Sequence, residues 1–216
     1  MFPEVARSLF VRKAFPFGEF KLKHHEKNPG APPSPYKADF RLRPDGPLDQ
    51  QDVQSLGSLI WLATYCGCDL KFDAVVGVPK AGDALAAVVA RILRVPQGFL
   101  AKEERRGKSE IVSRPGERLL EGVVLLIDDV VTEAESKLEA VRAIRHRKGL
   151  VWHIGLALDR EEGGVEVMAR DGVTVHAVWR ASELYRFFLD DQLIEQPDYD
   201  RVARYIDSRK KYRDEG

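Results

Sequence analysis

Between residues 72 and 180 the sequence alternates between short apolar runs and stretches with the spacing of amphipathic helices. The apolar runs lie at 72–79, 95–102, 122–131, 150–160 and 172–179, and helical stretches at 81–93 and 133–147. This alternation predicts βαβ units and therefore a doubly wound α/β domain around a parallel sheet. In such sheets ligands collect beyond the carboxyl ends of the strands, so the residues that follow each apolar run are candidates for the site.

The flanking segments are expected to complete one domain over residues 1–216. Residues 18–23 and 35–43 alternate like strands and are expected to pair as a hairpin with a long connection. With a preceding helix they would form a hood over 1–45, above the ligand end of an α/β core over 46–216. Helical patterns outside the alternating region lie at 3–14, 49–65, 181–190 and 197–209.

Composition and charge narrow the classes of function. Lys plus Arg and Asp plus Glu each number 34, so no overall field recruits nucleic acid or an anionic membrane. No apolar run approaches the ~20 residues of a membrane span, and the N-terminus lacks the apolar segment of a signal peptide. Two cysteines, Cys66 and Cys68, are too few and too close for a disulfide framework, so a cytoplasmic location is expected.

The same two cysteines raise the question of a metal site. Cys66 and Cys68 could ligate a metal, but no second pair nearby in the sequence completes four ligands. We therefore expect no metal-ligating residues and interpret both as buried thiols at the end of a helix.

Charged residues follow two of the apolar runs. Asp128 and Asp129 end the run that begins at Val123. Two fixed carboxylates there can accept hydrogen bonds from a ligand and stabilise developing positive charge, although a strand may simply end in solvated aspartates. Lys80 and Gly82 stand where a helix is expected to begin, and free N–H groups at a helix start can bind an anion; an ordinary tight βα turn has the same pattern.

Five stretches together resemble one family in their order and spacing. They are VVGVPKAGDALA (75–86), FLAKEERRGKSE (99–110), VVLLIDDVVT (123–132), ALDREEGG (157–164) and SPYKADFR (34–41). The chain resembles the type I phosphoribosyltransferases, and within them the orotate phosphoribosyltransferases, from about residue 18 to 205. The resemblance implies transfer of ribose 5-phosphate from phosphoribosyl pyrophosphate to orotate, with Mg²⁺ held mainly through the donor and water.

The resemblance also implies roles for individual residues. Asp128 and Asp129 would face the ribose, and Lys102 and Arg105 would lie on a mobile catalytic loop that reaches into a partner subunit, hence a homodimer. The pyrophosphate, 5-phosphate and base would be bound by further residues: Lys80, Ala81 and Gly82; Thr132, Glu133, Ala134, Glu135 and Ser136; and Lys23, Tyr36 and Arg160, respectively. A planar guanidinium such as that of Arg160 suits the carboxylate of orotate.

Two departures from the family pattern count against catalysis. Ala101 and Gly107 stand where the catalytic loop of the family has arginine and histidine, and Arg105 replaces a lysine. The 5-phosphate loop carries Glu133 and Glu135, and a carboxylate ~4 Å from a phosphate costs roughly 2 kcal/mol in water, about thirtyfold in affinity.

The phosphate loop also raises two structural questions. Ala134 replaces a glycine, which matters if that position needs a positive φ. Thr132 and Glu135 fit a capping box, in which side chains occupy the N–H groups that would bind phosphate. The sequence leaves three hypotheses open: an orotate phosphoribosyltransferase, a non-catalytic relative that binds a nucleotide or base as a sensor, and a transferase with another acceptor or donor.

Overall fold

The computed structural model describes residues 2–21, 30, 32–69, 71–105, 108–113 and 121–214. At its centre is a parallel five-stranded sheet in the order β4-β3-β7-β8-β9. The order reverses between β3 and β7, because β4 follows β3 on one side while β7, β8 and β9 extend the sheet on the other. The strands are β3 (Ala74–Gly77), β4 (Gln97–Gly98), β7 (Gly122–Val131), β8 (Gly149–Asp159) and β9 (Thr174–Arg180).

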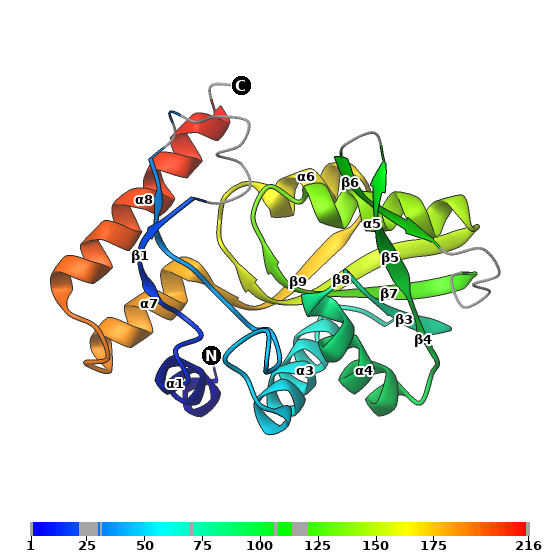
Figure 1. Cartoon of the computed structure of the whole chain (residues 1–216), viewed down its shortest axis with the longest axis horizontal. Coiled ribbons are helices and arrows are strands. Elements are labelled where there is room, and N and C mark those ends of the chain that lie inside the picture. The colour runs from blue at the N-terminus through cyan, green and yellow to red at the C-terminus, as the bar shows by residue number, and fades with distance from the viewer. Residues whose placement is uncertain are drawn as a thin grey trace.

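Helices cover both faces of this sheet (Figure 1). α3 (Gln50–Tyr65) and α4 (Ala81–Leu93) lie on one face, and α5 (Glu135–His146) and α6 (Gly164–Arg170) on the other. The middle of β7 is buried from both sides, which is why it is a continuous apolar run rather than an alternating one. The predicted doubly wound α/β sheet is confirmed.

The N-terminal elements and the last two helices gather at the carboxyl end of the sheet (Figure 1). α1 (Pro3–Val11), β1 (Phe17–Phe20) and β2 (Ser34–Tyr36) pack there with α7 (Ala181–Asp190) and α8 (Gln196–Asp214). We extend the name hood to these elements together, α7 and α8 included; aromatic contacts join them, among them a Tyr36–Tyr185 ring pair with centroids 4.7 Å apart. The division of the domain at residue 45 stays a prediction.

The hood hairpin is confirmed in part. β1 and β2 pair antiparallel, with Phe17 opposite Tyr36. The expected strand over 35–43 is wrong beyond Tyr36, where β2 ends; past it the N–H groups of Lys37 and Asp39 donate to the carbonyls of Pro16 and Ala14, in the segment just before β1. The chain therefore stays beside the same partner segment after the strand itself has ended.

Three other expectations needed correction. The expected strand at 95–102 is two strands, since β4 ends at Gly98 and β5 (Leu100–Arg105) pairs with β6 (Lys108–Ser113) in a separate hairpin. Helix α6, seven residues long with Gly163 as its N-cap, was not predicted. Cys66 and Cys68 do follow α3, but Cys66 is exposed and Cys68 only half-buried. Within the described ranges no helix is long and apolar enough to cross a membrane.

Candidate active site

Asp128 and Asp129 lie at the carboxyl end of β7. Asp128 is 3% exposed, and its Oδ2 lies 2.7 Å from Nζ of Lys137 on α5. Its Oδ1 accepts a hydrogen bond from the N–H of Asp129, whose own Oδ1 accepts one from the N–H of Val130. The pair is therefore held by its own backbone and by one buried cation.

Electrostatic repulsion is strong at this strand end. Burial, followed by the charge of Asp128, raises the pKa of Asp129. Burial and the charge of Asp128 also raise the pKa of Asp83, in the first turn of α4, to about 6. Three carboxylates thus share one region that favours positive charge on a bound group.

Helix α4 begins beside the aspartate pair. A Cβ on Gly82 would lie 2.4 Å from the carbonyl oxygen of Ile127, so only glycine lets the first turn of α4 approach β7 this closely. Lys80 is the N-cap residue and is exposed, and it lines a cleft of about 220 Å³ together with Ala81 and Arg41. The pKa of Arg41 is raised, mainly by its hydrogen bond to Asp39 and also by the negative charge of Asp129. The Lys80–Gly82 corner and the end of β7 therefore adjoin, as the sequence predicts.

The loop over residues 132–136 differs from the capping-box expectation. α5 begins at Glu135 with Ala134 as N-cap, and the first helical hydrogen bond runs from the N–H of Leu138 to the carbonyl of Ala134. Thr132 is therefore not an N-cap, and the capping box of Thr132 and Glu135 is wrong. The position does need a positive φ: Ala134 has φ 66° and ψ 7° and is buried.

Glu133 has a specific partner in the hood. Its Oε1 accepts a hydrogen bond from Nη2 of Arg209 on α8 at 2.6 Å. The Arg209 side chain is 12% exposed and that of Glu133 is 35% exposed. The carboxylate is thus neutralised by α8, which removes much of the repulsion expected for a phosphate at this loop.

Arg160 follows β8 and is buried under the hood. Its backbone N–H donates to the carbonyl of Val131, so the ends of β7 and β8 are joined. Its Nε donates to Oε1 of Glu162 at 2.7 Å, its Nη2 donates to Oγ of Ser34 at 2.7 Å, and its guanidinium carbon lies 4.2 Å from the centre of the Tyr36 ring. The side chain of Arg160 is 2% exposed and that of Glu162 is fully buried.

The hydroxyls around Arg160 are incompletely satisfied. The OH groups of Tyr36 and Tyr185 are buried and have no hydrogen-bond partner among the described residues. Burial raises the pKa of both, so both remain neutral donors at physiological pH. Buried donors without partners mark places where a ligand or water can bind.

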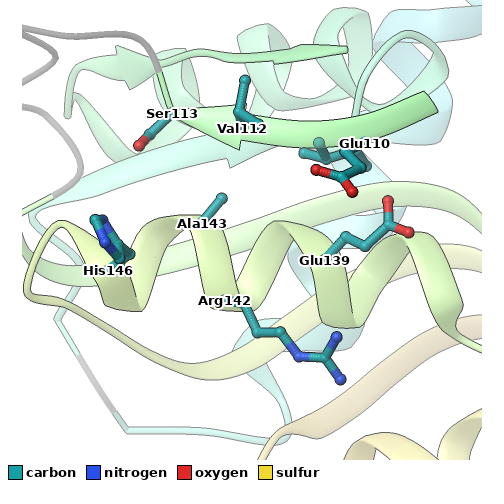
Figure 2. Close-up of a pocket in the computed structure, with 8 residues that line it drawn as sticks. Glu110, Val112, Ser113, Glu139, Arg142, Ala143 and His146 are labelled. Carbon is teal, nitrogen blue, oxygen red and sulfur yellow. The ribbon is translucent and has the colours of Figure 1, made fainter. Parts of the chain in front are cut away.

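The β5–β6 hairpin lies along α5. A hollow of about 510 Å³ separates β6 from α5, with Glu110 near Glu139 and Ser113 near His146 (Figure 2). Since α5 starts at Glu135 and β6 runs alongside it in the same direction, the Arg105–Lys108 end of the hairpin is directed towards the start of α5. Lys102 of β5 is exposed and forms no ion pair with any described residue.

The structure therefore brings together most of the predicted site. Asp128, Asp129 and the 132–136 loop adjoin the Lys80–Gly82 corner and Arg160, which lies on Tyr36. Lys102 stands apart on the hairpin, and Arg105 is the last residue of β5. Lys23 lies outside the described residues.

Comparisons with known proteins decide the family. A model of the phosphoribosyl transferase domain matches residues 61–185, more than half of the chain. The chain is a member of the phosphoribosyltransferase family. The match includes Lys80, the aspartate pair, the 132–136 loop and Arg160.

Relatives of this phosphoribosyltransferase span most of its length. A Staphylothermus marinus protein named orotate phosphoribosyltransferase is 28% identical and aligns over 96% of this chain and 95% of its own. One of the same name from Caenorhabditis elegans is 32% identical over 77% of this chain and 68% of its own. The crystal structure of orotate phosphoribosyltransferase from Aeropyrum pernix has a TM-score of 0.65 and 26% identity, and the match covers 84% of this chain and 96% of that one.

Sequence reasoning missed the partners that hold the site of this phosphoribosyltransferase. Lys137, Arg209 and Glu162 each fix a candidate residue through an ion pair. Glu162 was detectable as the carboxylate two residues after Arg160, and Lys137 as a cation in the first turn of α5. Arg209 gave no signal, because it is 76 residues from Glu133.

The raised pKa of Asp83 gives the first testable prediction. A folded-state pKa of about 6, against an ordinary 3.8, means that the folded protein binds this proton more tightly than the unfolded chain. The stability that comes from protonated Asp83 is therefore fully present below pH 4. It is lost as the pH rises through about 6 and the buried carboxyl ionises. Asp83→Asn should raise the free energy of unfolding at pH 7 by about 1 kcal/mol, allowing for partial exposure, and by less at pH 4.

Urea unfolding of both proteins at pH 4, 5, 6 and 7 measures this difference. Comparing the two proteins cancels the contributions of other buried carboxyls, including Asp129. An identical pH dependence in the two proteins contradicts the prediction.

Proposed function

We propose that the chain transfers ribose 5-phosphate from phosphoribosyl pyrophosphate to orotate. The observation that carries the proposal is Arg160, a guanidinium at the end of β8 that lies over Tyr36 under the hood. A planar, permanently charged fork suits the carboxylate that distinguishes orotate from uncharged bases. The names of the relatives support the same acceptor.

The other groups have roles in the same reaction. Asp128 and Asp129 accept hydrogen bonds from the ribose hydroxyls and stabilise cationic character on the sugar in the transition state. The start of α4 at Lys80, Ala81 and Gly82 binds the pyrophosphate, and the start of α5, over 132–136, binds the 5-phosphate. Lys23 contacts the base or donor, and Lys102 and Arg105 neutralise the departing pyrophosphate when the hairpin closes over the site.

Orotate binding requires a local rearrangement. Arg160 is 2% exposed and already has Glu162 as its partner, so a substrate carboxylate competes with that of Glu162. The buried hydroxyls of Tyr36 and Tyr185 become donors to the base once the hood shifts. Closure after binding then excludes water from the cationic transition state.

Magnesium fits the oxygen-rich strand end. Mg²⁺ prefers carboxylate, phosphate and water oxygens, and Oδ1 of Asp83 is buried and accepts no hydrogen bond from any described residue. The ion would be held mainly through the donor substrate and water near Asp83 and the aspartate pair, where it offsets phosphate charge. The family resemblance supports a homodimer in which each catalytic loop serves the partner's site, and cysteine usage supports the cytoplasm.

A direct assay tests the proposal. The protein is mixed with orotate, phosphoribosyl pyrophosphate and Mg²⁺, and orotidine monophosphate is measured by chromatography. Product that increases with enzyme concentration supports the assignment. No product at high enzyme concentration would refute it.

One observation favours the alternative of a non-catalytic relative that senses a nucleotide or base. Nε of Arg160 already donates to the carboxylate of Glu162, so the charge of Arg160 has a partner without a substrate. Calorimetry separates the two functions: a sensor binds nucleotide or base without turnover, whereas binding of phosphoribosyl pyrophosphate as tight as in active relatives counts against it.

The Glu133–Arg209 pair gives a prediction for donor binding. Arg209→Met should raise KM for phosphoribosyl pyrophosphate by about thirtyfold, because a freed carboxylate near the 5-phosphate costs roughly 2 kcal/mol. Adding Glu133→Gln should restore the KM. Arg201→Met is the matched control, since Arg201 pairs with Asp198 on the same helix and on its exposed face. If the double variant stays as weak as Arg209→Met, Arg209 itself contacts the donor and the charge argument fails.

A further inference from the structure

Three metal-ligating side chains from distant parts of the chain meet on the α3 side of the sheet. Sγ of Cys68, a ring nitrogen of His153 and a ring nitrogen of His176 all lie within 4.8 Å of one another. Cys68 follows the end of α3, His153 is on β8 and His176 is on β9. The sequence offered no such cluster, because its members are 23 or more residues apart.

The two histidines already face each other through ring nitrogens. Nδ1 of His153 lies 2.8 Å from Nε2 of His176, and the rings are stacked with centroids 5.0 Å apart. One proton can occupy the space between two such nitrogens, so at least one lone pair points into the cluster. In a tetrahedral zinc site, bonds of about 2.0–2.1 Å place two nitrogens about 3.3 Å apart, only slightly farther than here.

The turn that carries Cys68 is pressed against this histidine pair. A Cβ on Gly67 would lie 2.5 Å from Nδ1 of His176, so the glycine allows the Cys66–Cys68 turn to touch the imidazole. The ring of Phe72 contacts that of His153 edge-on and covers another side of the cluster. Cys68 and His153 are each partly exposed, which leaves a route from solvent.

We propose that Cys68, His153 and His176 bind one Zn²⁺ ion, with water as the fourth ligand. A thiolate and two imidazoles suit zinc, whereas Mg²⁺ prefers oxygen. His153 precedes Arg160 by seven residues of mostly extended chain, so this site is ~20 Å from the substrate corner. The ion ties the end of α3 to β8 and β9 and is separate from the Mg²⁺ of the proposed transfer reaction.

Metal content is the first test. Tag-free, reduced full-length protein is stripped with a chelator, loaded with zinc, desalted and analysed by mass spectrometry. We expect one zinc per chain in the unaltered protein and in Cys66→Ser, whose thiol is exposed two residues away. Cys68→Ser and His176→Gln should each weaken zinc binding by at least about 100-fold, since losing even a group that only orients a ligand costs 10–100-fold.

Cobalt substitution gives a second readout that requires no folded variant. Co²⁺ bound by the unaltered protein should give a sulfur-to-metal charge-transfer absorption, which Cys66→Ser retains. Circular dichroism checks that Cys68→Ser is folded before its metal content is compared. Absence of bound zinc, absence of the sulfur band, or equal loss in Cys66→Ser and Cys68→Ser would each overturn the proposal, while orotidine monophosphate formation tests the transferase independently.

Discussion

Arg160→Met lowers the free energy of unfolding by about 3–5 kcal/mol and abolishes use of orotate. The substitution removes the guanidinium that pairs with the fully buried carboxylate of Glu162, and breaking one side of a buried ion pair costs about this much. It also removes the hydrogen bond to Ser34 and the stacking on Tyr36. Chemical unfolding measures the first effect and steady-state kinetics the second.

The neighbouring ion pair provides the matched control. Arg180 pairs with Glu161 but is 59% exposed, so Arg180→Met should cost less than about 1 kcal/mol. The double variant Arg160→Gln with Glu162→Gln removes both charges and should lose less stability than the sum of the two single variants. It should still fail to use orotate. Equal stability of Arg160→Met and Arg180→Met would contradict the buried pair, and orotate turnover by the folded double variant would contradict the assigned role.

Asp128→Asn should lower kcat by about 10²–10³, the usual loss for one fixed group that stabilises transition-state charge. Asparagine keeps the size of the side chain and an oxygen for the N–H of Asp129, but it removes the negative charge that faces the sugar. It also leaves the buried ammonium of Lys137 without this counterion, so some stability is lost as well.

Asp171→Asn is the control for this second change. Asp171 forms an ion pair with Arg145, which is on α5 like Lys137. This ion pair lies at the end of α5 opposite the 132–136 loop, so kcat should not change. Kinetics are measured at a temperature where thermal melts find both variants folded. A kcat within threefold of the unaltered protein for Asp128→Asn would contradict a catalytic role for its charge.

The pattern of the sequence predicted the central elements well because local and tertiary preferences agree there. The expected bounds of β7, α4 and α7 match those of the structure. β7 is buried on both faces, and a run such as Val123–Ile127 has few other conformations that hide it. The family assignment rested on the residues at these strand ends, and the match over 61–185 confirms it.

Predictions failed where a distant contact decides the local structure. The Thr132-to-Glu135 pattern favours a capped helix, yet the connection from β7 places Ala134 at a positive φ and starts α5 at Glu135. The partner of Glu133 comes from α8, and the neighbours of Cys68 come from β8 and β9. Such pairings depend on the finished packing and leave no periodicity to detect.

The Glu133–Arg209 contact links the charge of the 132–136 loop to the final helix. Across 76 residues of chain the two side chains behave as one neutral unit. The number of carboxylates in the loop therefore overstates the negative potential at the position of a bound phosphate, because Arg209 neutralises one of them. The final helix thus sets the electrostatic character of a segment to which it does not belong, and the two positions have to vary together if phosphate affinity is to be preserved.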